Sequence, residues 1–253
     1  MFGNFDWQEI WTSLPYLFKV GMVFTVTLTA LAMTGGLILG TLLAMMRLSS
    51  FRALSRIATA YVNFMRSVPL LLVIFWFYFL VPYIGGYLFH QLYLLNPTGL
   101  GALLVDVFGY QVKSGGVIQV GGFASSLITF TIFEAAYYAE IMRAGIQSIS
   151  RGQVYAGYAL GLNYWQTMGR IVLPQAFRNM LPVLLTQTII LFQDTSLVYV
   201  LSLTDFFGAA SKIAQRDGRL VEMYLFAAFV YFVICYSGSL LVKRLQVKLA
   251  VIR

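Results

Sequence analysis

Charged residues are scarce in this chain, and their scarcity excludes an ordinary soluble domain. Of its 253 residues, 10% are Asp, Glu, Lys or Arg and 60% are hydrophobic, with a mean hydropathy of +0.80. A soluble domain keeps about a quarter of its residues charged, and a chain this apolar would expose large hydrophobic patches in water. We therefore predict an all-α protein embedded in a lipid bilayer.

Residues that build disulfides, metal sites and catalytic centres are equally sparse. Cys235 is the one cysteine and His90 the one histidine, which excludes an intrachain disulfide and disfavours a metal site. No lysine follows a glycine, so the phosphate-binding loop G-x-x-x-x-G-K-[ST] is absent, as is the Gly-x-Ser-x-Gly motif of serine hydrolases. We expect a chain that is not an enzyme and binds no cofactor.

Apolar runs long enough to cross a bilayer, about 20 residues in a helix, occur five times. They cover residues 20–46, 53–81, 123–143, 180–201 and 221–242. In the first run, Gly36 and Gly40 form a small-xxx-small pair that would let another helix approach closely. The second is expected to kink at Pro69 and to end over residues 82–86. Residues 100–108 are a candidate interfacial helix.

Basic residues are distributed unevenly between the two sides of these five spans. One side holds twelve of the seventeen: Arg47, Arg52, Arg56, Arg66, Arg143, Arg151, Arg170, Arg178, Lys243, Arg244, Lys248 and Arg253. The positive-inside rule places this side in the cytoplasm, which also explains the net charge of +8 without a nucleic-acid partner. The N-terminus is then outside and the C-terminus inside. Residues 1–9 contain acids and no base, so a cleavable signal is not expected.

The segment between the third and fourth runs, residues 147–179, is polar and rich in helix formers. Residues 156–160 can form a short helix that Gly161 ends. Asn163 can cap a second helix that runs to about Ile171 and stops at Pro174. Two helices joined at a glycine would project from the membrane as a compact knob, a shape suited to docking a soluble partner.

This segment resembles the signature of binding-protein-dependent ABC importer permeases: E-A-A, three residues, G, nine residues, then I-x-L-P. Tyr155 stands where glutamate is usual, and Gly157 where the second alanine is usual. The literal Glu134-Ala135-Ala136 does not fit, because the glycine is missing at the required spacing. The resemblance assigns ATPase coupling to Gly152, Gln153, Tyr155, Ala156, Gly157, Gly161, Ile171, Leu173 and Pro174.

Four flanking segments look like the polar amino acid branch of these permeases, and together they most resemble glutamate/aspartate importers. They are YVNFMRSVPLLLVIFWFY (61–78), EAAYYAEIMRAGIQSISRGQ (134–153), LPQAFRNMLPVLLTQ (173–187) and LFQDTSLVYVLSLTDFF (191–207). The resemblance covers nearly the whole chain and is weakest over residues 84–121. It implies one type I ABC transporter transmembrane domain, residues 1–253, in the bacterial cytoplasmic (inner) membrane.

The partners follow from the same resemblance. Such permeases pair with a second permease subunit, either a copy or a paralogue. They recruit a cytoplasmic ABC ATPase dimer, which binds ATP and Mg, and receive cargo from an extracytoplasmic solute-binding protein. The signature loop is the coupling helix: closure of the ATPase dimer moves the docked helices, and the bundle alternates its access.

Polar residues inside the spans are candidates for the translocation path, because such residues face a bundle interior or a water-filled cavity. They are Arg66, Gln187, Asp194, Thr195 and Ser196. The patch at 193–196 has an alternative role as a polar tie between helices or as a cap at a helix break. Arg66 could meet an anionic substrate or Glu134, or snorkel to the interface. Glu140 and Arg143, three residues apart on a helix, favour a structural ion pair over a gate.

The alternative function is an ion-coupled secondary amino acid transporter or a channel that acts alone. It predicts transport by the isolated chain that is abolished by collapse of ion gradients rather than by removal of ATP. The folded cytoplasmic loop favours the importer, because a carrier that acts alone needs no dock for an ATPase.

Overall fold

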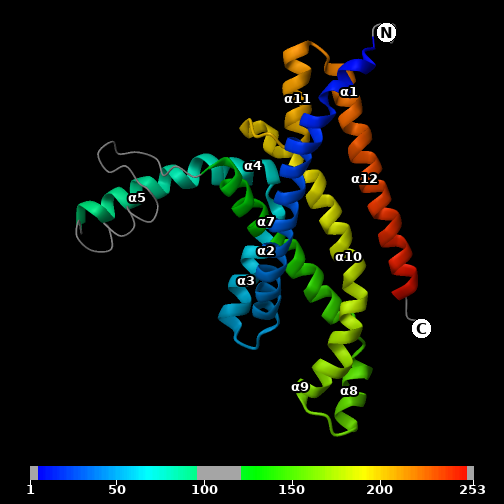
Figure 1. The fold of residues 1–253 in the computed structure, drawn as a ribbon. Coiled ribbons are helices and arrows are strands. Elements are labelled where there is room, and N and C mark those ends of the chain that lie inside the picture. The colour runs from blue at the N-terminus through cyan, green and yellow to red at the C-terminus, as the bar shows by residue number, and fades with distance from the viewer. Residues whose placement is uncertain (1–4, 96–120, 250–253) are drawn as a thin grey trace. The chain divides into compact units, whose positions relative to one another are not determined.

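Helices are the only regular elements in residues 5–95 and 121–249, the part of the chain that the computed structural model describes (Figure 1). The all-α prediction is therefore confirmed. The chain forms two compact units, one made of residues 1–67 and 131–253 and the other of residues 68–130. The candidate interfacial helix at 100–108 lies outside the described residues.

Within the described ranges, four helical stretches are long and apolar enough to cross a membrane. They are Trp7–Leu48, Leu70–Leu88, Tyr164–Leu201 and Leu220–Leu249. The predicted third span lies in α7 (Gly122–Gln147), which is not among the four. At a rise of 1.5 Å per residue α7 is about 39 Å long, enough to cross, but it contains three charged residues. The count of five spans stays a prediction.

The first helix begins earlier than residue 20. It comprises α1 (Trp7–Tyr16), the π-helical η1 (Leu17–Met22) and α2 (Val23–Leu48) without a break. The side chain of Asp6 caps its start by accepting the backbone N–H groups of Gln8 (2.9 Å) and Glu9 (3.2 Å). The search for apolar runs missed α1 because its sequence, WQEIWTSLPY, is far less apolar than that of α2.

Small residues bring α2 against α7, as predicted for the Gly36 and Gly40 pair. A Cβ atom on Gly40 would lie 2.8 Å from Tyr138 Cβ and 3.0 Å from the carbonyl oxygen of Ala135. A Cβ atom on Gly36 would lie 3.2 Å from Glu134 Cβ. Both glycines are buried. The two helices are therefore too close for any larger residue at position 40.

The second predicted span is broken, not kinked. α3 (Arg52–Ser67) ends before Pro69, whose ψ of 132° is extended, and α4 (Leu70–Phe75) begins directly after it. Proline disfavours helical geometry in the residue before it, so the chain leaves the helix at Val68. The break also separates the two compact units, with α3 in the first and α4 in the second.

The predicted end of this span at residues 82–86 is wrong. α4 passes into the π-helical η2 (Trp76–Leu80) and then α5 (Val81–Leu95), which contains Pro82, Gly85 and Gly86. A helix in an apolar environment satisfies its own backbone groups. That requirement outweighs the weak helix propensity of these residues.

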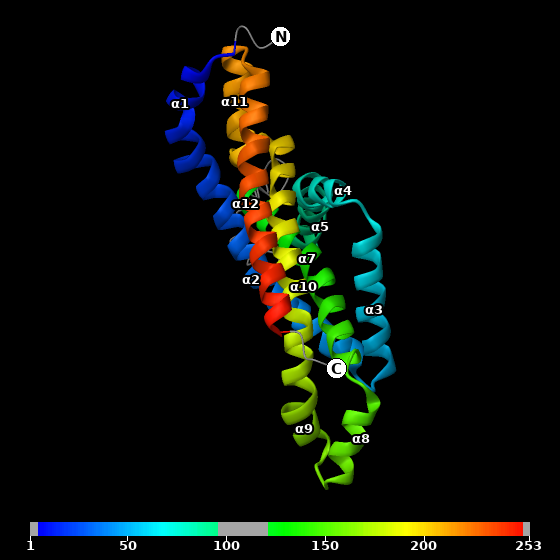
Figure 2. The same ribbon diagram turned by 90° about the vertical axis from the view of Figure 1, so that its right-hand side faces the viewer.

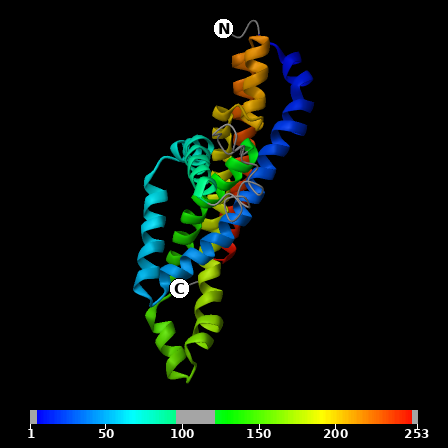
Figure 3. The same cartoon turned by 90° about the vertical axis from the view of Figure 1, so that its left-hand side faces the viewer.

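A second group of helices packs around α11 (Phe206–Asp217) in the unit that contains residues 131–253. α12 (Leu220–Leu249), η1 and α1 surround it, and their shared core contains Leu17, Phe206, Ala210 and Met223. α1 and α11 lie at one end of this unit, and α8 and α9 lie at the other (Figures 1, 2 and 3).

Candidate functional sites: the coupling knob and a polar cluster

The predicted knob is present and spans residues 151–172. α8 (Arg151–Ala159) ends at Leu160, and Gly161 follows with φ +80°, the left-handed geometry that favours glycine. The N–H of Gly161 donates to the carbonyl oxygen of Tyr158 at 2.9 Å, and that of Leu162 donates to Gly157 at 3.1 Å. The glycine stop predicted from the sequence is confirmed.

The second helix of the knob begins with a capping box. The side chain of Asn163 accepts the N–H of Gln166 at 2.9 Å, and the Gln166 side chain accepts the N–H of Asn163 at 3.0 Å. α9 (Tyr164–Thr167) then passes into the π-helical η4 (Met168–Val172). The cap predicted at Asn163 is confirmed.

Pro174 does not end this helix, contrary to prediction. η4 continues into α10 (Leu173–Asp194) and the 3-10 turn η5 (Thr195–Leu201), so one helical stretch runs over Tyr164–Leu201. Pro174 lies in the first turn of α10, directly after the π-helical turn, where a missing N–H is tolerated. The knob is therefore joined to the membrane-embedded part of the chain by a continuous helix.

Gly157 explains one departure from the family signature. It is buried, and a Cβ atom on it would lie 2.9 Å from Ile171 Cδ1 and 3.0 Å from Thr167 Cγ2. Real Cβ atoms essentially never lie under 3.0 Å from another heavy atom, so an alanine would force the end of the Ile171 side chain to move. The glycine thus costs helix propensity but permits the tight packing that gives the knob its shape.

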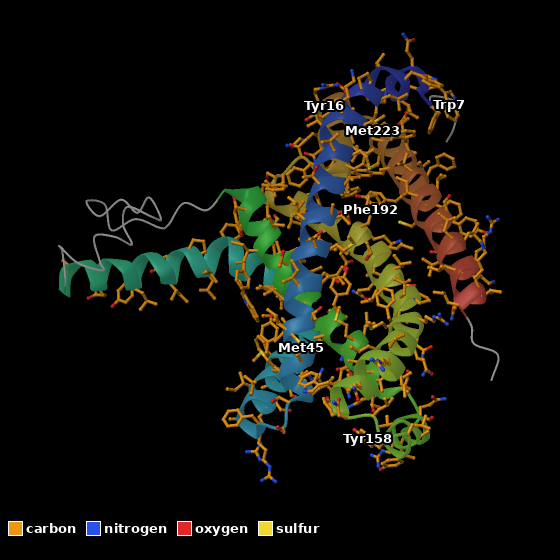
Figure 4. All side chains as sticks on the ribbon, turned by 60° about the horizontal axis from the view of Figure 1, so that its bottom comes forward. Trp7, Tyr16, Met45, Tyr158, Phe192 and Met223 are labelled. Atoms are coloured by element: carbon orange, nitrogen blue, oxygen red, sulfur yellow. The ribbon has the colours of Figure 1, made fainter. Side chains whose placement is uncertain are left out.

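The remaining coupling candidates are exposed except for Ile171, which is half-buried, and two of them, Leu173 and Pro174, begin α10 directly after the knob. Its tip is apolar and exposed: Leu160 is 81% accessible and Trp165 79%, and Tyr155 and Tyr158 are also exposed. Figure 4 labels Tyr158 on the helices of the knob. A folded element that presents aromatic side chains to solvent is suited to bind another protein.

Near the knob, Glu140 is the centre of an arginine cluster. Its carboxylate accepts hydrogen bonds from Arg47 and from Arg143, the latter at 2.5 Å from Nη2 and 3.2 Å from Nε. Arg66 Nη1 lies 3.8 Å from Oε2. The ion pair predicted between Glu140 and Arg143 is confirmed, and Arg66 pairs with Glu140 rather than Glu134.

Deeper in α7, Glu134 is completely buried. The Gln187 side-chain amide of α10 donates to both of its carboxylate oxygens, at 3.2 and 3.3 Å. Tyr137, one turn further along α7, lies under the guanidinium of Arg66 at 5.6 Å from the ring centroid.

Two of the five path candidates, Arg66 and Gln187, contact Tyr137 and Glu134, and these four residues form the polar cluster. Asp194, the last residue of α10, is half-buried. Thr195 is buried, and its hydroxyl donates to the Phe192 carbonyl oxygen at 2.7 Å. Ser196 is half-buried. Thr195 thus satisfies its own hydrogen bond locally and does not join the polar cluster.

Comparison with known proteins identifies the architecture. Residues 36–251 match the family described as the inner membrane component of binding-protein-dependent transport systems. The chain belongs to this family. It is 52% identical to the glutamate/aspartate import permease protein GltK of Escherichia coli O6:H1, over 96% of this chain and 97% of the relative. It is 28% identical to the glutamine transport system permease protein GlnP of Escherichia coli K12, over 98% and 100%.

Solved structures agree with this assignment. A crystal structure of an amino acid ABC transporter with histidines is 27% identical to the permease, covers 96% of it and 98% of its own chain, and has a TM-score of 0.78. The MetNI methionine ABC transporter shares the fold, at 16% identity, 91% and 96% coverage and a TM-score of 0.58. The protein is thus a multi-pass inner-membrane permease component of an ABC importer, and it is not an enzyme.

Sequence reasoning missed Tyr137 and the central position of Glu134 in the permease. Tyr137 carries no charge and lies among other aromatic residues, so its position under Arg66 has no signature in the sequence. Glu134 was noted as part of a false match to the family signature and as a possible partner of Arg66, but not as the partner of Gln187. Its spacing from Tyr137 on one helix was the available signal, since residues three apart are neighbours.

Proposed function

We propose that this permease forms the path by which an ATP-driven importer moves glutamate and aspartate across the inner membrane. The observation that carries the proposal is the 52% identity to a glutamate/aspartate import permease over 96% of the chain. Identity to the glutamine permease is much lower, at 28% over a similar length.

The knob is the docking element for a cytoplasmic ABC ATPase dimer, which binds ATP and Mg. Its support is geometric. The tip exposes Leu160 and Trp165, the body is rigidified by close packing at Gly157, and one helical stretch of 38 residues connects it to Asp194. Displacement of the knob by the ATPase would be transmitted along this helix as a rigid body.

The translocation path contains Arg66, Gln187 and Asp194, with Thr195 and Ser196 beside them. The half-buried Asp194 offers a carboxylate for the ammonium group that every amino acid carries, and Arg66 offers a guanidinium group for its carboxylate. A second permease subunit completes the path, and an extracytoplasmic solute-binding protein delivers the cargo. None of the relatives described above favours a carrier that acts without ATP.

The test is reconstitution of the permease with its partner permease, ATPase and binding protein in liposomes. We expect glutamate-loaded binding protein to stimulate ATP hydrolysis, and uptake of labelled glutamate to be inhibited by unlabelled aspartate. Efficient inhibition by arginine or histidine instead would refute the substrate assignment. Uptake by the permease alone, without nucleotide, would refute the importer.

Two exposed tryptophans at opposite ends of the first unit allow a test of whether the ATPase docks on the knob. Trp165 in the knob is 79% accessible and Trp11 in α1 is 70% accessible. We expect Trp165→Ala to reduce co-purification of the ATPase at least severalfold, whereas Trp11→Ala retains it. Equal retention by both variants would show that the ATPase docks elsewhere.

A further inference from the structure

The arginine cluster around Glu140 contains more positive charge than its internal carboxylate can neutralise. Arg47, Arg66 and Arg143 share Glu140. One carboxylate and three guanidinium groups leave a formal surplus of two positive charges. A cluster whose only role were to tie α2, α3 and α7 together would need one cation for each carboxylate, because unbalanced charge in a partly buried site is costly.

Some hydrogen-bond donors of the arginine cluster also lack an acceptor among the described residues. The Arg47 side chain is 9% accessible, and its Nε is buried with no hydrogen-bond partner among the described residues. Arg66 is 39% accessible and its contact with Glu140, 3.8 Å, is too long for a hydrogen bond. The site therefore contains one buried unsatisfied donor and one accessible arginine. Both are suited to accept a further anion.

The location of the cluster indicates which anion this is. Arg47 is the penultimate residue of α2, and Glu140 and Arg143 lie in the last two turns of α7, just before the knob. Arg66 connects this end to the path, because it also lies over Tyr137. An anion that has passed the cluster around Glu134 would next meet Arg66.

We propose that Arg47, Arg66 and Arg143 form an exit-side subsite that binds a carboxylate of the acidic cargo, with Glu140 as an internal competitor that displaces it. The subsite rests on the proposed function, because it requires an anionic amino acid. Guanidinium groups bind carboxylates in bidentate geometry. Glu140 occupies the arginines when cargo is absent, which keeps the surplus charge from holding the cargo permanently.

The first experiment measures glutamate transported per ATP hydrolysed by the complete complex in liposomes. Arg66→Gln is expected to lower this ratio about tenfold, and Arg66→Lys should restore part of it. Arg56→Gln is the matched control, because Arg56 lies on the same helix, is exposed, and is not part of the cluster. An Arg66→Gln ratio equal to that of the Arg56→Gln control would overturn the subsite.

A second variant separates binding from structural support. In nanodiscs without binding protein, Glu140→Gln should raise the affinity of the complex for labelled glutamate severalfold, because the competing carboxylate is removed. A purely structural role predicts the opposite, namely weaker binding and a lower unfolding temperature. Weaker glutamate binding in a variant that unfolds at the parental temperature would also reject the proposal.

Two further comparisons show whether the bound anion is cargo or a lipid headgroup, and whether a negative result refutes the subsite or the proposed function. The transport ratio is measured in liposomes of phosphatidylcholine alone and in liposomes that also contain phosphatidylglycerol. If the Arg66→Gln effect requires phosphatidylglycerol, the subsite binds a lipid headgroup and not cargo. If the parental complex transports neither glutamate nor aspartate, the proposed function itself fails. Transport by the parent with no Arg66→Gln effect refutes the subsite alone.

Discussion

At the scale of single residues, Gly157 departs from the family signature at a position where its neighbours Ile171 and Thr167 leave little room for a side chain. Alanine is the better helix former, yet here its Cβ atom would lie 2.9 Å from Ile171 Cδ1. We expect Gly157→Ala to destabilise the knob by about 1–3 kcal/mol through overpacking. The measurement is ATPase co-purification with the permease, which should fall.

The same contact supplies the control. Ile171→Val removes the Cδ1 atom that the new methyl group would meet but leaves the 3.0 Å approach to Thr167 Cγ2, so Gly157→Ala combined with Ile171→Val should recover part of the co-purification. Ile171→Val alone removes one methyl group from a half-buried side chain and should cost about 0.5–1.5 kcal/mol at most. If the double variant is as impaired as the sum of the two single variants, the close packing does not explain the glycine.

Gln187 stabilises the buried carboxyl group of Glu134. Its amide is the hydrogen-bond donor to that group, at 3.2 and 3.3 Å. Gln187→Leu keeps the volume but leaves the carboxyl group unsatisfied, which should cost about 1–3 kcal/mol. Thermal unfolding of the purified permease measures the loss. Gln246→Leu, at an exposed position of α12, should leave the unfolding temperature nearly unchanged, and equal losses would contradict this role.

At the scale of elements, the sequence predicted helix ends that depend on local residues, but not those that depend on how the helix continues or packs. Gly161 and Asn163 set the ends of two helices through their own backbone and side-chain geometry, so the sequence alone located them. Pro174 and Pro82 were misjudged because π-helical turns next to them accommodate the proline. No periodicity signals such a turn in advance.

The polar cluster shows the same limit between elements. The sequence indicated Arg66, Gln187 and Asp194 because charged or amide groups are rare in apolar runs. It could not indicate their partners, since these depend on how α3, α7 and α10 pack. The sequence accordingly left an anionic substrate, Glu134 and the membrane interface as alternatives for Arg66, whereas the structure pairs it with Glu140, six residues beyond Glu134 along α7.

The attachment of α1 and η1 to α11 and α12 gives a prediction at this scale. Leu17 is fully buried in their shared core, whereas Glu9 forms a 3.9 Å ion pair with the highly exposed Arg216. We expect Leu17→Ala to cost about 2–4 kcal/mol and Glu9→Gln to cost much less, because solvent screens an ion pair with an exposed partner. Urea titration of the permease compares the two, and a larger loss for Glu9→Gln would refute attachment by apolar packing.

At the scale of the whole molecule, charge distribution and helix arrangement point to one orientation. Twelve of the seventeen basic residues fall on the side predicted to be cytoplasmic. In the first unit, α1 and α11 lie at the end opposite to the knob (Figures 1 and 2). A knob that faces the ATPase therefore requires α1 to lie outside the cytoplasm, in agreement with the positive-inside rule.

Cysteine labelling tests this orientation directly, because the native Cys235 is buried and gives little background. Gln8 in α1 is exposed, and so is Trp165 in the knob. A membrane-impermeant maleimide added to spheroplasts should label Gln8→Cys and not Trp165→Cys, whereas membranes opened by sonication should allow both to react. Labelling of Trp165→Cys in intact spheroplasts would invert the topology and remove the knob from the reach of a cytoplasmic ATPase. The mechanism depends on this result, since rigid-body transmission along Tyr164–Leu201 needs its driven end in the cytoplasm.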